Sequence, residues 1–223
     1  MCKSFSIFII ILCFKGSSLF AQNIEIGAFA GANSSIVGVR SEYGISEDGK
    51  SKPVISYNTG VYLSSINQGK FGLTGSIEYL RIQNKIKNGI EITDINGESF
   101  GAFDKSIINH YITLSTLGKI QLTKKLYAGI GVSENFLCKS VLKLNKDFID
   151  YNFERKNYGK KFTNYYYKRF VVSIPVIIGL KLNQFDVFLR FNKAVMNRIK
   201  KDSYVKEYEN TLILGLGYRF VKI

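Results

Sequence analysis

The segment SIPVIIGLKLNQFDVFLRFN, residues 173–192, contains two runs of alternating residues joined by a polar pair. All even-numbered positions from Ile174 to Leu182 are apolar, and so are all odd-numbered positions from Phe185 to Phe191. A period of two residues is typical of a β-strand with two unlike faces. Because only residues 183–184 separate the runs, the segment predicts a tight antiparallel hairpin.

The same alternation recurs throughout the chain after the N-terminal region. We expect eight strands, at residues 24–31, 55–64, 71–79, 111–120, 126–133, 171–181, 185–192 and 211–220. No run of eighteen apolar residues follows Gln22, so a transmembrane helix is not expected. An even number of alternating strands predicts an all-β fold, an eight-stranded antiparallel up-and-down transmembrane β-barrel.

The links between the expected strands alternate between short and long. The short links are residues 67–70, 123–125 and 183–184, and the long links are residues 33–54, 83–106, 139–169 and 193–209. Short periplasmic turns and long extracellular loops are typical of outer-membrane barrels. The last strand must then pair with the first, because an open edge in hydrocarbon would leave backbone groups unpaired.

The two faces of the strands differ in a way that indicates which one is the inside. Glycines collect on the more polar face, beside large residues such as Tyr62 and Arg219, and the hairpin register sets Gly179 opposite Phe188. A narrow barrel needs such a mixture of small and large side chains in its lumen. We therefore expect the apolar face to meet lipid; a lipocalin-like soluble barrel is the alternative.

The N-terminal residues have the layout of a secretory signal peptide. Lys3 precedes the apolar residues 5–14, small residues follow, and Ala21 precedes Gln22. We expect a cleaved signal peptide at residues 1–21 and the barrel domain at residues 22–223, located in the cell outer membrane of a Gram-negative bacterium.

The chain is strongly basic, with 31 Lys and Arg against 17 Asp and Glu and a net charge of +14. Loss of Lys3 and Lys15 with the signal leaves 29 basic residues against 17 acidic ones, a net charge of +12. An exported protein rarely meets nucleic acid, so we expect no nucleic-acid partner and favour outer-membrane lipid and lipopolysaccharide. The alternative is that the lysines only keep the loops solvated.

The residues that could support catalysis or bind a metal are few. His110 is the one histidine, and Cys138 is the one cysteine after residue 21, so we expect no metal site, no cofactor and no internal disulfide. The His-x-Ser pattern of lipid A deacylases is absent, since Ile112 occupies the third position. We predict no catalytic residue and no enzyme, with a lipid-modifying barrel enzyme as an alternative.

The third long link, residues 139–169, is the candidate binding surface. It carries nine basic, three acidic and eight aromatic residues. The candidate contacts to anionic lipid are Lys156, Lys160, Lys161, Lys168 and Arg169. Base stacking would use similar residues, but an interfacial aromatic belt beside phosphate-rich lipopolysaccharide suits an exported barrel better.

Four charged residues are expected to form ion pairs inside the lumen. The hairpin sets Lys181 directly opposite Asp186, where opposite charges can pair. Closure of the barrel sets Glu25, near the start of the first strand, beside Arg219, near the end of the last. We predict the pairs Lys181–Asp186 and Glu25–Arg219.

Several motifs resemble those of a known family. They are FAQ at residues 20–22, YITLSTLGK at residues 111–119, SIPVIIGLK at residues 173–181 and GLGYRF at residues 215–220. In them the chain resembles the PorT-like outer-membrane β-barrel family, over nearly all of the mature sequence. The resemblance implies an outer-membrane barrel of mostly unassigned function, and some members serve protein secretion.

The expected function is therefore a structural or binding role in the outer membrane, exerted through long basic and aromatic extracellular loops. The alternatives are a subunit of an outer-membrane secretion or assembly machine, with a protein partner in that membrane, and the lipid-modifying enzyme. A general porin is disfavoured because eight strands leave no open channel.

Overall fold

The computed structural model describes residues 23–41, 51–66, 70–93, 99–144, 167–199 and 205–222. The strands in these ranges are β1 (Asn23–Ser41), β2 (Ser51–Val54), β3 (Ser56–Ile66), β4 (Phe71–Thr93), β5 (Ser99–Gln121), β6 (Leu126–Leu144), β7 (Phe170–Leu182), β8 (Phe185–Ala194) and β9 (Val205–Lys222). No helix in these ranges is long and apolar enough to cross a membrane. The expected signal peptide, residues 1–21, lies outside them.

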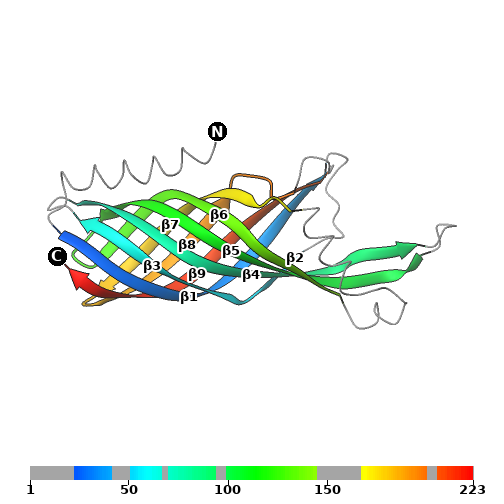
Figure 1. Ribbon diagram of the computed structural model, residues 1–223, viewed down its shortest axis with the longest axis horizontal. Coiled ribbons are helices and arrows are strands. Elements are labelled where there is room, and N and C mark those ends of the chain that lie inside the picture. Colours follow the sequence, from blue (N-terminus) through cyan, green and yellow to red (C-terminus); the bar gives the residue numbers. More distant parts are fainter. Residues whose placement is uncertain are drawn as a thin grey trace.

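The strands close into a ring of eight (Figure 1). Hydrogen-bonded neighbours follow the order β4, β3, β1, β9, β8, β7, β6, β5 and then β4 again. The short β2 and the longer β3 both pair with β4 and are separated by Ile55 alone, so they form one barrel strand. The pairing of β1 with β9, in which Ala30 faces Leu216, confirms the predicted closure.

The β7–β8 hairpin has the predicted register. Asn183 and Gln184 form the turn, and Leu182 lies opposite Phe185. Asn183 has a positive φ of 53°, a conformation that Asn tolerates better than most residues. This turn, the turn at residues 123–125, the start of β1 and the end of β9 all lie at one end of the barrel, here called the turn end (Figure 1). The opposite end is the loop end.

Several strands are longer than predicted, and the expected boundaries of all four long links are wrong. β6 continues to Leu144, into the expected link 139–169, and β9 begins at Val205, inside the expected link 193–209. The links expected at residues 33–54 and 83–106 are shortened further. β1 continues to Ser41, and β4 and β5 stay paired as far as Thr93 and Ser99. The two form a ribbon that runs past the other strands at the loop end (Figure 1). Beyond the membrane both faces of a strand meet polar surroundings, so the alternation fades while backbone pairing continues.

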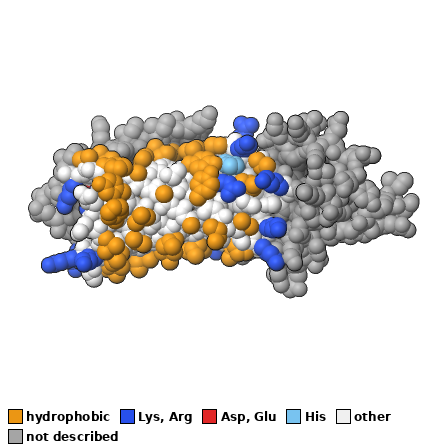
Figure 2. Space-filling view, turned by 90° about the horizontal axis from the view of Figure 1, so that it is seen from below, with side chains coloured by type: hydrophobic (Ala, Val, Ile, Leu, Met, Phe, Trp, Pro, Cys, Tyr) orange, Lys and Arg blue, Asp and Glu red, His pale blue; other side chains and the backbone are white. Residues whose placement is uncertain are grey.

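The two faces of the sheet are assigned as the sequence predicts. On β8 the outward side chains of Val187 and Leu189 are 38% and 43% exposed, whereas Phe188 and Arg190 are 7% and 2% exposed. Figure 2 shows apolar side chains over the described barrel wall, with Lys and Arg at both ends of the apolar area. This surface is the inverse of a soluble barrel, so the lipocalin-like alternative fails.

The height of the apolar area matches a bilayer. On β4 the outward positions run from Phe71 through Ile77 to Tyr79, and Arg81 follows. Eight residue steps span about 26 Å along a strand and about 20 Å along the axis at a tilt of about 40°, close to the apolar band of outer-membrane barrels. The fold is therefore that of a membrane-spanning barrel.

Aromatic rings fill the lumen where glycines make room for them. A Cβ atom at Gly215 would overlap the ring of Phe188, and one at Gly179 would overlap the ring of Tyr127. Gly179 does lie opposite Phe188 in register, as predicted, but the ring that covers it comes from Tyr127 on the other neighbouring strand. Such packing holds the interior of the barrel closed.

Candidate functional site

Residues 195–199, the described part of the link between β8 and β9, fold back against the mouth at the loop end. Arg198 in this link is 2% exposed and donates to Glu207 Oε2 at 2.8 Å and to Glu209 Oε1 at 2.8 Å. Its backbone N–H donates to the Glu207 carbonyl at 3.0 Å, and its carbonyl accepts from Lys168 N at 2.7 Å. These bonds hold the link inside the mouth.

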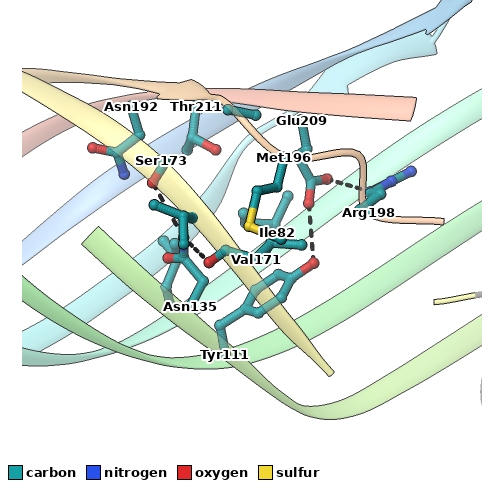
Figure 3. Close-up of a pocket in the computed structure, with 13 residues that line it drawn as sticks. Ile82, Tyr111, Asn135, Val171, Ser173, Asn192, Met196, Arg198, Glu209 and Thr211 are labelled. Atoms are coloured by element: carbon teal, nitrogen blue, oxygen red, sulfur yellow. Dashed lines mark hydrogen bonds and ion pairs between the residues drawn. The ribbon is translucent and has the colours of Figure 1, made fainter. Parts of the chain in front are cut away.

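The electrostatics of the mouth keep Arg198 charged. Burial alone would lower the pKa of its guanidinium, but Glu209, Tyr167 and Glu207 hold that pKa well above its usual value. The Glu209 carboxylate also accepts from the Tyr111 hydroxyl at 3.2 Å, so it links the mouth to the lumen wall (Figure 3). The guanidinium lies 4.9 Å from the centre of the Tyr167 ring.

We call Arg198 and its partners Glu207 and Glu209 the plug. Beside it lies a small cavity of about 30 Å³, lined by both polar and apolar side chains. Figure 3 shows Asn135 directed to Ser173 on the neighbouring strand, with Met196 and Ile82 on the apolar side. A space of this size has room for only a few water molecules. It cannot form a binding pocket for a solute of ordinary size.

The centre of the lumen is closed by an ion pair that no sequence pattern indicated. Arg190 Nη2 lies 2.6 and 2.7 Å from the two carboxylate oxygens of Glu78, and both side chains are almost fully buried. Asn58 donates to the same carboxylate at 3.2 Å. Phe29 packs below, with its ring centre 6.0 Å from the Arg190 guanidinium carbon.

The turn end of the lumen holds the four charged residues that the sequence singled out. Arg219 Nη1 lies 2.7 Å from Glu25 Oε1, so the structure brings this expected pair together. Lys181 Nζ lies 3.4 Å from Glu25 Oε2, and Arg219 Nη2 lies 3.7 Å from Asp186 Oδ1. We call Glu25, Lys181, Asp186 and Arg219 the turn-end cluster.

The partners within this cluster differ from the expected ones. Lys181 lies opposite Asp186 in register and both point inward, but the described ion pair of Lys181 is with Glu25 on β1. The expected Lys181–Asp186 pair is therefore wrong in its partner. In a narrow lumen, inward side chains from non-adjacent strands converge, so a long lysine reaches across the barrel instead of along the ladder.

The expected lipid contacts of the third link lie partly outside the described residues. Lys156, Lys160 and Lys161 fall there. Lys168 and Arg169 lie at the base of β7, where the Arg169 carbonyl accepts from Leu137 N at 2.8 Å. Lys168 is half-buried, and the Arg169 side chain is exposed.

The histidine lies on the outer wall. His110 Nδ1 is hydrogen-bonded to the Tyr79 hydroxyl, and neither side chain points into the lumen. Arg81, which sequence reasoning did not single out, lies opposite His110 in register. Within the described ranges, no group of three or more His, Cys, Asp and Glu side chains could hold a metal ion.

A closed ring, a lipid-facing apolar wall and a polar, filled lumen define a β-barrel of the outer-membrane class. No protein-family model and no curated protein sequence matches the chain. Among solved structures, it is similar to Ail, the attachment invasion locus protein of Yersinia pestis, solved with the heparin analogue sucrose octasulfate. That match has 15% identity, covers 88% of this chain and 99% of the other, and has a TM-score of 0.39.

Two further solved structures have similar scores. The outer membrane protein OprG from Pseudomonas aeruginosa has 12% identity, with 90% of this chain and 97% of the other covered and a TM-score of 0.39. Neisserial surface protein A has 10% identity, with 86% and 97% covered and a TM-score of 0.41. The barrel assignment itself follows from the pairing of the strands.

Proposed function

We propose that this outer-membrane barrel acts by binding at the cell surface and conducts no solutes. The observation that carries the proposal is the filled lumen. It is closed by Arg198 at the mouth, by the Glu78–Arg190 pair at the centre and by the turn-end cluster. A barrel closed at three levels leaves the loops and the outer wall as the surfaces that can act on other molecules.

The proposed ligand is lipopolysaccharide, through the basic and aromatic third link. The exposed Arg169 and the half-buried Lys168 stand at the base of that link, at the loop end. Lys156, Lys160 and Lys161 are proposed to extend this positive surface. Basic residues near an anionic lipid surface contribute about 1 kcal/mol each, so several of them make a useful attraction.

The orientation follows the same proposal. The turn end faces the periplasm and the loop end faces outward, after export and cleavage behind Ala21. A catalytic role is not proposed, because the His110 imidazole is bonded to a tyrosine hydroxyl on the lipid-facing wall, and among the described residues it has no hydrogen bond to the Ser or carboxylate that a hydrolase would use.

A protein partner is a second candidate, supported by the ribbon of β4 and β5. The pairing of β4 with β2 ends at Ile86, and that of β5 with β6 ends at Lys105. From residue 90 to residue 103 the described pairings of these strands are with each other only. Strand edges that have no described neighbour can accept a strand from another protein, which is how a subunit of a secretion or assembly machine, suggested by the PorT-like resemblance, could bind its partner.

The lipopolysaccharide proposal is tested by removing positive charge at one end at a time. One variant replaces Lys156, Lys160 and Lys161 by Gln; the matched control replaces the exposed turn-end lysines Lys70, Lys124 and Lys125 by Gln. Binding of the full-length mature protein to lipopolysaccharide micelles should weaken about 10-fold or more in the first variant and little in the control. Equal affinities in both variants would contradict the proposal.

A further inference from the structure

Three basic side chains form a row on the outer wall of the barrel. Arg81 on β4 lies opposite His110 on β5, and His110 lies opposite Lys139 on β6. All three point away from the lumen, and the histidine lies among Lys and Arg at the loop-end border of the apolar area (Figure 2). Neighbouring strands are about 4.8 Å apart, so the row is about 10 Å wide.

The row stands where hydrocarbon gives way to headgroups. One register step toward the turn end lie Tyr79 on β4, Ile112 on β5 and Phe136 on β6, with the exposed Cys138 in a bulge between Phe136 and Lys139. Ile112 and Phe136 are each 38% exposed to the outside. A ligand held by the row would therefore have its acyl chains beside an apolar wall.

Aromatic residues hold Arg81 and His110 in place. The Arg81 guanidinium carbon lies 5.7 Å from the centre of the Tyr57 ring, and the ring centres of Tyr57 and Tyr79 are 6.1 Å apart. Tyr79 in turn is hydrogen-bonded to His110, with ring centres 5.9 Å apart. Side chains fixed in this way lose little conformational entropy when they bind a ligand.

The positive charge of the row is not neutralised by the described part of the chain. Arg81 donates to two neutral oxygens, Ser56 Oγ at 2.9 Å and Gln83 Oε1 at 2.9 Å. Each described lumen arginine, by contrast, has a carboxylate partner. The acidic Glu134 on the same face of β6 lies opposite Leu114, four residues or about 13 Å from His110 along β5.

We propose that Arg81, His110 and Lys139 bind the phosphate of a phosphorylated glycolipid in the outer leaflet. The planar guanidinium can bind two phosphate oxygens, Lys139 supplies a second charge, and the imidazole between them can donate a hydrogen bond. The inference rests on the proposed function only in that it sets the loop end at the cell surface. Its residues are separate from those of the third link.

The test measures binding of bisphosphorylated lipid A to the purified mature protein in detergent. The variant Arg81→Gln/Lys139→Gln should weaken binding about 10-fold or more, because two charge-assisted contacts are lost. Lys124→Gln/Lys125→Gln, with the same loss of charge at the turn end, should bind like the unchanged protein. Arg81→Lys should fall between them, since it keeps the charge and loses the fork. Heat-modifiable migration verifies the fold of each variant.

Dephosphorylated lipid A should bind the unchanged protein as weakly as bisphosphorylated lipid A binds the double variant. We call Arg81, His110 and Lys139 the wall site. The proposal would be overturned if the double variant bound bisphosphorylated lipid A with unchanged affinity. It would also be overturned if inorganic phosphate displaced the labelled lipid A as well as unlabelled lipid A does at the same concentration. If the wall variant keeps its affinity for lipid A while the third-link variant binds lipopolysaccharide more weakly, the wall-site inference fails and the proposed function stands. If only the third-link variant keeps its affinity, the proposed third-link contact fails and the wall site stands.

Discussion

Arg190 on β8 and Glu78 on β4 meet across the centre of the barrel, with one guanidinium nitrogen 2.6 and 2.7 Å from the two carboxylate oxygens. Since β4 and β8 are not neighbours in the ring, the pair connects opposite walls. Both side chains are almost fully removed from water, so each charge depends on the other.

Breaking this pair from one side should be costly. Arg190→Leu leaves the Glu78 carboxylate buried with no cation beside it, and about 3–5 kcal/mol of unfolding free energy should be lost. The double variant Glu78→Leu/Arg190→Leu should recover most of that loss, because no charge remains buried. Urea unfolding in lipid vesicles measures both. If the unfolding free energy of Arg190→Leu lay within about 1 kcal/mol of the unchanged protein, Glu78 would not need Arg190 to stay buried, and the prediction would be wrong.

The turn-end cluster should respond unequally to loss of its two acids. Glu25 lies within ion-pair distance of both Arg219 and Lys181, whereas Asp186 has one described ion pair, at 3.7 Å. Glu25→Gln should therefore lower the unfolding temperature more than Asp186→Asn. Adding Arg219→Gln to Glu25→Gln should relieve part of the loss. A larger drop in unfolding temperature for Asp186→Asn than for Glu25→Gln would contradict this geometry.

The packing of rings against lumen glycines predicts a sharp difference between two identical substitutions. Gly215→Ala sets a methyl group against the Phe188 ring and should cost about 1–3 kcal/mol, as overpacking does. Gly75→Ala, on the outward face of β4, is the control, because nothing lies within 4 Å of the added carbon. Comparable losses in the two variants, measured by urea unfolding, would argue against a filled lumen at this level.

His110 should be dispensable for any lipid chemistry. Its imidazole is bonded to the Tyr79 hydroxyl on the outer wall, and no hydrogen bond described for it joins it to a serine hydroxyl or a carboxylate. His110→Ala should therefore leave the mass spectrum of lipid A unchanged in cells that carry the variant. Loss of a lipid A modification in that strain would restore the enzyme alternative.

The sequence predicts the fold well because lipid and lumen impose opposite demands on successive residues. Alternation identifies strands and faces, and a two-residue turn sets the β7–β8 register, including Lys181 opposite Asp186. Neither signal gives the position of a side chain along the barrel axis relative to side chains on a non-adjacent strand. The Glu78–Arg190 and Lys181–Glu25 ion pairs depend on that axial position, so they could not be predicted.

The plug and the wall site escaped prediction for other reasons. Arg198 lies in a link without periodicity, and only its folding back into the mouth gives it partners. Arg81 falls between the expected end of its strand at residue 79 and the expected start of the next long link at residue 83. The continuation of β4 past the membrane border would have been needed to place Arg81 beside His110.

The most direct test of the account is the electrical conductance of the purified mature protein in a planar lipid bilayer. Three closed levels in the lumen predict no stable current steps after insertion, while heat-modifiable migration verifies that the barrel is folded. Reproducible stepwise currents that scale with salt concentration would mean that the lumen is open. The proposal that this barrel acts only through its outer surfaces would then be wrong.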